Sequence, residues 1–351
     1  MNDESPPFAC PIEPSAGGDT ISLAHGEGGR LMRRLIRERI LSRLGNEWLS
    51  PMSDAAVLPP ISGQPVFTTD SYVVSPLFFP GGDIGTLAVF GTANDLVVSG
   101  ARPLWISLSL ILEEGLPLET LDCVLESVAA AAKLAGVRVV TGDTKVVPRG
   151  AADGLFITTS GIGELLGPAP CGPRSLAVGD ELIVSGPIGS HGVAILACRE
   201  NLGFEPPPRS DSAPLGEAVD ALRNAGVPFR ALRDATRGGV AAVLHEWAAE
   251  CNLTLTIDEQ AIPVRPEVRG ACELLGLDPL HVANEGTMVI AIPQGSGERA
   301  VSVLRQTSLC AGAAVIGSVV PRRVVPVTVL RALGNEQPLD EPSGSPLPRI
   351  C

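Results

Sequence analysis

Apolar residues recur at two spacings along this chain, and the two alternate from segment to segment. Leu31, Leu35 and Ile36 begin a stripe at helical spacing, whereas residues 103–112 alternate as a strand does. Helices are predicted at 30–44, 87–98, 118–135, 191–199 and 235–251. Strands are predicted at 65–69, 103–112, 137–141, 155–162, 181–185, 253–257, 288–292 and 314–320. This interleaving favours an α/β and α+β fold class with mixed sheets packed with helices.

Proline and glycine clusters divide the chain into parts. Residues 1–19 hold several prolines and read as a flexible leader, and a Gly–Pro-rich stretch at 167–173 separates two halves. We therefore expect an N-terminal domain at 20–166 and a C-terminal domain at 174–333. Residues 334–351 lose all periodicity and predict a flexible tail that ends in a cysteine. Fully extended, an arm of 17 residues could reach roughly 50 Å.

The composition narrows the possible functions. The net charge is −13 and aromatics are only 3%, so neither the basic surface nor the stacking rings of a nucleic-acid binder are expected. No apolar run is long enough for a transmembrane helix, and the start lacks the pattern of a signal peptide. Eight scattered cysteines without a close pair suit a reduced, cytoplasmic protein. An anionic substrate such as ATP would need a metal ion or focused cations here.

Five aspartates lie beside Gly, Ser or Thr near the ends of predicted elements. They are Asp54, Asp70, Asp95, Asp143 and Asp234. Hard oxygen ligands from separate loops suit Mg²⁺ that bridges a triphosphate. The alternative for each is a helix or turn cap, above all for Asp234, which directly precedes a predicted helix. Gly28 and Gly29 precede another helix and form a possible anion cradle. The P-loop and protein-kinase motifs are missing from the sequence, and no zinc-protease helix pattern occurs.

Several motifs, in order along residues 20–351, together closely resemble one family. They are Thr69–Val73, Phe78–Gly82, Gly91–Leu96, Leu112–Pro117, Thr141–Val147, Asp234–Val240, Ala283–Gly286 and the terminal Pro348–Cys351. The resemblance is to the HypE family, the carbamoyl dehydratases of nickel–iron hydrogenase maturation. It implies two domains of the aminoimidazole ribonucleotide synthetase type and a homodimer formed through the N-terminal sheets.

The resemblance also implies a chemistry and assigns roles to residues. A partner carbamoyltransferase would load Cys351, and ATP would drive dehydration of the carboxamide to a thiocyanate, whose cyanide passes to iron on a scaffold complex. Glu285 would be the base and Lys145 would offset developing charge. Mg²⁺ would be held by Asp70, Asp95 and Asp143. ATP would be bound by these together with Asp54, Asp234, Asn94, Gly28 and Gly29.

Two alternatives remain open from the sequence. One is another ATP-dependent enzyme of the same superfamily, such as selenophosphate synthetase, which would want a reactive cysteine near the N-terminus. Cys10 lies in the leader without the expected glycines around it. The other is a maturation scaffold that presents Cys351 to partners without catalysis. ATP hydrolysis that depends on a carbamoylated tail would distinguish an enzyme from a scaffold.

Overall fold

The structure is a computed structural model that describes residues 20–344 and 349–351. The predicted leader, 1–19, lies outside the described residues. Two compact units are present. The first contains residues 20–96, 101–165 and 351, and the second contains residues 97–100, 166–344 and 349–350. No helix in the described part of the chain is long and apolar enough to cross a membrane.

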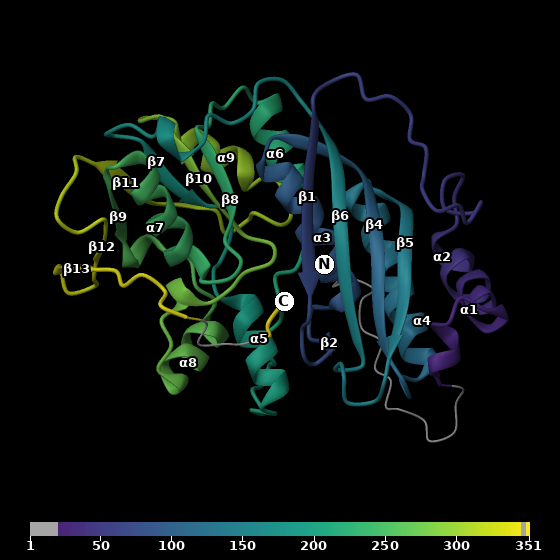
Figure 1. The fold of residues 1–351 in the computed structure, drawn as a ribbon. Coiled ribbons are helices and arrows are strands. Elements are labelled where there is room, and N and C mark those ends of the chain that lie inside the picture. The colour runs from purple at the N-terminus through teal and green to yellow at the C-terminus, as the bar shows by residue number, and fades with distance from the viewer. Residues whose placement is uncertain (1–19, 345–348) are drawn as a thin grey trace. The chain divides into compact units, whose positions relative to one another are not determined.

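The first unit is built on a four-stranded sheet in the order β1-β6-β4-β5, in which only β4 and β5 run parallel (Figure 1). Its elements are η1 (Leu23–His25), α1 (Arg30–Leu35), the π-helix η2 (Ile36–Leu41), α2 (Ser42–Leu44), β1 (Pro65–Tyr72), β2 (Phe78–Phe79), β3 (Gly82–Asp83), α3 (Ile84–Val98), β4 (Ala101–Glu113), α4 (Leu118–Ala135), β5 (Arg138–Val147) and β6 (Leu155–Leu165). The last residues of α3 group with the second unit.

Helix α3 covers one face of this sheet. It is buried on nearly all sides, and only Asp95 is partly exposed. The Thr159 hydroxyl of β6 donates to the carbonyl of Ala88 on α3, at 3.3 Å. The buried Asp83 starts the helix by accepting from the backbone N–H groups of Gly85 and Thr86. Within the described residues the opposite sheet face carries no such helix, and we call it the outer face.

The second unit has a seven-stranded sheet in the order β13-β12-β9-β11-β7-β10-β8 (Figure 1). Its elements are η3 (Pro173–Ser175), β7 (Glu181–Val184), α5 (Ser190–Arg199), α6 (Gly216–Asn224), β8 (Ala231–Asp234), α7 (Gly239–Cys251), β9 (Thr254–Asp258), η4 (Glu259–Ala261), α8 (Pro266–Leu275), η5 (Pro279–His281), β10 (Met288–Ile292), α9 (Gly297–Leu304), β11 (Ala314–Val320), β12 (Val327–Leu330) and β13 (Glu336–Pro338).

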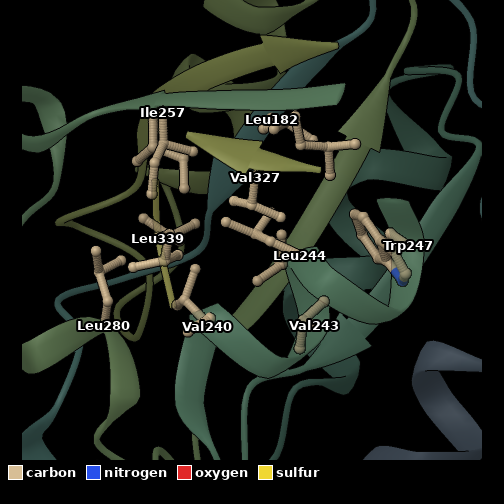
Figure 2. Packing of buried hydrophobic residues seen from close by; sticks show 14 of the residues in the cluster. Leu182, Val240, Val243, Leu244, Trp247, Ile257, Leu280, Val327 and Leu339 are labelled. Carbon is tan, nitrogen blue, oxygen red and sulfur yellow. The ribbon is translucent and has the colours of Figure 1, made fainter. Parts of the chain in front are cut away.

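Apolar side chains fill both faces of the second sheet. Leu182 of β7 packs with Leu244 and Trp247 of α7 in one cluster, which Figure 2 shows from close by. The next residue, Ile183, belongs to a second cluster with residues of α6 and α9. Successive strand side chains point to opposite faces, so a sheet covered on both sides needs continuous apolar strands. The runs at 181–185 and 288–292 have this pattern.

The C-terminal arm contains regular structure that the sequence did not predict. Glu336–Pro338 forms β13 and pairs antiparallel with β12, and Leu339 is buried in the core cluster around α7. Its side chains show no strand periodicity because this edge strand is held through its backbone and its residues are exposed. The sequence also missed α6, α8 and α9, and it placed the start of α7 four residues too early. Turn residues 236–238 intervene, with Gly238 in the left-handed region at φ 77°.

Candidate functional site

The outer face of the first sheet carries a charge pair on its edge strand. Asp143 and Lys145 lie two apart on β5 and therefore point to the same face. The Lys145 ammonium lies 2.9 Å from one Asp143 oxygen, and the Thr144 N–H donates to the other at 2.8 Å. The hydrogen bond from Lys145 is the largest cause that lowers the pKa of Asp143. Desolvation opposes it, and the weaker effect of the Thr144 bond adds to the lowering. Both side chains are more than half exposed, so water and ligand can reach them.

Asp70 of β1 and Asp95 of α3 both lie on the other side of the same sheet. Thr68 lies two residues before Asp70 on β1, and its hydroxyl donates to Asp95 of α3 at 2.7 Å. The strands align Asp70 with Thr159, Thr159 with Leu108, and Leu108 with Gly142. Aligned residues share a face. Asp70 therefore faces α3, as Thr159 does.

This register separates Asp143 from the other two predicted metal ligands, Asp70 and Asp95. Asp143 follows Gly142 and so faces away from Asp70, across three strand spacings or about 14 Å. Asp70 and Asp143 of one chain do not share one ion. No group of three His, Cys, Asp or Glu residues within 20–344 and 349–351 is placed to hold a metal. Mg²⁺ commonly takes only one or two carboxylates and completes its shell with water and phosphate oxygens. Asp70 and Asp95 would together supply two carboxylates, and Asp143 would supply one. Each of these two groupings fits that donor set.

Asp70 and Asp143 also lie inside strands and not at strand ends, which corrects the expectation from the sequence. Strand β1 continues to Tyr72 and β5 to Val147. Polar residues such as Thr69, Ser71 and Lys145 are accommodated because each strand keeps one face away from the core. The polar runs were therefore continuations of strands and not loops.

The remaining first-unit candidates lie around the same sheet. Asp54 is exposed and lines a hollow with Phe67, Ser107 and Thr141, which belong to three strands. The glycine loop before α1 lies beside β5, because a Cβ on Gly26 would come within 2.9 Å of the Val146 nitrogen. In that loop Gly28 has φ 73° and, like Gly29, has open space around it. Asn94 is buried on α3.

In the second unit, Glu285 lies in a turn whose backbone is held on several sides. Its own N–H and that of Gly286 each donate to the Asp211 carboxylate at 3.1 Å, and the Thr287 hydroxyl donates at 3.0 Å. A Cβ on Gly286 would lie 1.8 Å from the Asp211 carbonyl oxygen, so only glycine fits. Glu285 is 5% exposed.

Asp234 lies next to this turn and caps no helix. It is the last residue of β8, is 8% exposed, and is separated from α7 by a turn. The Asn284 amide and backbone N–H both donate to the carbonyl of Ala235, at 2.8 and 3.0 Å. The structure thus brings Asp234 and Glu285 together, and Asp234 does not cap the helix that follows it, whose N-cap is Gly238.

The end of the chain is held in place at its three described residues, 349–351. In the second unit, Ile350 is 4% exposed, and its carbonyl accepts from His191 Nε2 at 2.6 Å. The Arg199 guanidinium donates to the carbonyl of Arg349 at 2.7 Å. Cys351 groups with the first unit, where its carbonyl accepts from the Val73 N–H at 3.1 Å.

Sequence reasoning missed His191, Ser210 and Asp211. Asp211 holds the Glu285 turn, and Ser210 lies 2.8 Å from His191 Nδ1. Little in the sequence indicated a role for Ser210 and Asp211, because residues 205–215 are rich in proline and serine and have the pattern of an ordinary loop. Only the fold brings this loop to residues about 75 positions further along the chain.

Two family models divide the chain as its two units do. The AIR synthase related protein N-terminal domain matches residues 52–165, and the AIR synthase related protein C-terminal domain matches residues 177–329. These matches define the general class of this protein, which has the two domains of AIR synthase related proteins.

The relatives are more specific. Carbamoyl dehydratase HypE of Escherichia coli K12 is 49% identical over 95% of this chain and 100% of its own length, and that of Rhizobium leguminosarum bv. viciae is 48% identical over 94% and 95%. A crystal structure of the hydrogenase maturation protein HypE in complex with ATP superposes with a TM-score of 0.89 at 45% identity, covering 94% of this chain and 99% of that one. A HypE-HypF complex gives a TM-score of 0.77 at 41% identity, covering 90% and 100%. This chain belongs to the HypE family of carbamoyl dehydratases.

Proposed function

We propose that this chain uses ATP to dehydrate a carbamoyl group on its own Cys351 to a thiocyanate, as a step in hydrogenase maturation. The observation that carries the proposal is the position of the chain's end. Ile350 is bound by His191, and His191 lies against Ser210, whose neighbour Asp211 holds the Glu285 turn. The residue before the reactive cysteine is therefore tied to the segment that positions the proposed base.

The chemistry requires a leaving group and a base. Transfer of the γ-phosphoryl group of ATP to the amide oxygen would make that oxygen leave as phosphate, while the two amide protons are lost and the C≡N bond forms. The products are ADP, inorganic phosphate and the S-cyano cysteine. Glu285 is the proposed acceptor of a proton, and Lys145 would offset charge on the phosphate or the amide oxygen.

ATP and its metal ion would bind to the first unit. Asp70 with Asp95, and Asp143, would hold Mg²⁺, which neutralises phosphate charge. Asp54, Asn94 on α3 and the glycine loop with Gly28 and Gly29 would line the nucleotide site of the first unit, and Asp234 on β8 of the second unit is a further proposed ATP-binding residue. The relative crystallised with ATP supports nucleotide binding.

Partners follow from the same proposal. A carbamoyltransferase would load Cys351, which the HypE-HypF complex supports, and an iron-scaffold complex would accept the cyanide. The outer sheet face supports a homodimer. Phe67, Ile162 and Trp105 are aligned there on three neighbouring strands, and Phe67 is 66% exposed.

The test is the mass of the C-terminal peptide after loading of Cys351 with a carbamoyl group. Addition of Mg-ATP should remove the mass of one water from that peptide and release stoichiometric phosphate. Cys351→Ala should fold and bind ATP but give no product, since the tip of a short arm contributes little to either core. A loaded peptide whose mass is unchanged by ATP would leave this chain as a scaffold.

A second experiment adds a few residues after Cys351. The thiol and its reach are kept, so a defect would reflect fit at the site. We expect slower dehydration. A wild-type rate would mean that the site is open beyond the C-terminus.

A further inference from the structure

Three of the four histidines in the chain hold the C-terminal arm. His245 Nε2 lies 2.9 Å from the carbonyl oxygen of Leu339, and His281 Nε2 lies 2.9 Å from that of Asp340. His191 Nε2 lies 2.6 Å from the carbonyl oxygen of Ile350. The first two therefore bind the root of the arm and the third binds its tip.

The contacts of His191 fix its tautomer. A carbonyl oxygen only accepts, so Nε2 carries the proton, and Nδ1 of the neutral ring accepts from the Ser210 hydroxyl at 2.8 Å. The ring is completely buried, and this burial lowers the pKa of His191, while the hydrogen bond to the Ile350 carbonyl and, after it, the nearby Asp211 oppose the effect. A neutral imidazole with one donor and one acceptor satisfies both neighbours.

The segment that fixes His191 also fixes the proposed base. Ser210 accepts from the Ser212 N–H at 3.1 Å in addition to its contact with the ring. The intervening Asp211 accepts from the backbone of Glu285 and Gly286. The contact at Ile350 and the turn that carries Glu285 are thus joined through two consecutive residues.

From these contacts we infer that His191 is a positioning residue, which acts through Ile350 to hold Cys351 for dehydration in register with the Glu285 turn. This rests on the proposed function. His245 and His281 bind the root of the arm at Leu339 and Asp340. The eleven residues that follow Asp340 could span at most about 40 Å if fully extended, which is shorter than the reach expected from the sequence.

The main test compares His191→Leu, which loses the donor, with His191→Gln, whose amide keeps one. Single-turnover formation of thiocyanate from the carbamoyl-loaded full-length protein is measured at saturating Mg-ATP. Leaving a buried carbonyl unpaired should slow His191→Leu about 5- to 150-fold. The Kd for Mg-ATP should stay within about twofold, and His191→Gln should recover most of the rate. His281→Leu is the matched control at the root and should retain most of the wild-type rate.

A second readout does not depend on turnover. In the unloaded protein, the rate at which iodoacetamide alkylates Cys351 is followed by the mass of the C-terminal peptide, which separates it from the exposed Cys171 and Cys198. Release of the tip in His191→Leu should accelerate this alkylation by a similar factor. Buried Cys272, whose pKa burial raises to about 11, should stay unmodified and so reports that the fold is intact.

Arg199→Met keeps the test decisive if His191→Leu does not fold. It removes the donor to Arg349 from a partly exposed position, and Arg299→Met is its control, because Arg299 donates to the carbonyl of Ala225 away from the arm. Faster alkylation of Cys351 in Arg199→Met but not in Arg299→Met supports the proposal that the tip of the arm is held. Wild-type rates of alkylation and turnover in the His191 and Arg199 variants would overturn it. Absence of thiocyanate from the wild-type protein would refute the proposed function instead, and the alkylation rates would still decide whether the tip is held.

Discussion

The Asp143–Lys145 pair and the Glu285 turn place ionisable groups in opposite surroundings. The pair lies on an edge strand, more than half exposed, with each charge balanced by the other. The turn is buried, and its backbone is bound by Asp211 and packed against it. An exposed carboxylate can exchange water for a hydrated metal and a nucleotide, whereas a buried one is shielded from water. On this contrast we propose that the first site binds ligand and that the second transfers protons.

Replacing Glu285 by Gln should separate the two roles most strongly. The isosteric amide fits the same turn but cannot accept a proton, so dehydration should fall about 10²- to 10⁴-fold while Mg-ATP binding persists. Product is followed by the mass of the loaded C-terminal peptide, and binding by calorimetry. Glu273→Gln, an exposed carboxylate on α8, is the control and should behave as wild type. Wild-type turnover by Glu285→Gln would remove this residue as the base.

The first site is tested by Asp143→Asn and Asp95→Asn. Each should weaken Mg-ATP binding by about 1–3 kcal/mol, the range for losing a charged partner. If the carboxylates act through the metal, the variants and the wild type should bind ATP equally well when it is titrated without Mg²⁺. The exposed Asp153→Asn in the β5–β6 connection is the control. Unchanged calorimetric affinity of either variant would exclude that residue from the metal site.

The contrast also explains what the sequence could predict. Helical periodicity predicted α4 at its observed ends, and short apolar runs predicted both continuous apolar strands of the second core, because those patterns record burial directly. It did not predict which carboxylates meet. Asp70 and Asp143 look alike in sequence, yet strand register turns them to opposite faces. Nor could it find His191, Ser210 and Asp211, whose roles depend on contacts with residues distant in sequence. Local patterns report burial, while a polar site depends on register and long-range packing.

The smallest expected effect is on the pH dependence of stability, and it again distinguishes the two regions. Hydrogen bonding lowers the pKa of Asp143 from its ordinary value of 3.8, so its contribution to stability is lost only in acid below that value. Burial lowers the pKa of His191 from 6.5.

Below about pH 6.5, therefore, the unfolded chain binds a proton at His191 that the folded chain does not. The free energy of unfolding should then fall as the pH decreases, by at most about 1.4 kcal/mol per pH unit, until the folded histidine is protonated too. His191→Gln has no such proton and should lose less stability between pH 7.5 and 5.5. Denaturant unfolding can be followed through Trp247, in the second core, once Trp48 and Trp105 are replaced by Phe. His281→Gln controls for loss of a histidine bound to the arm. Identical pH profiles for the wild type and His191→Gln would mean that His191 is not held neutral in the folded protein.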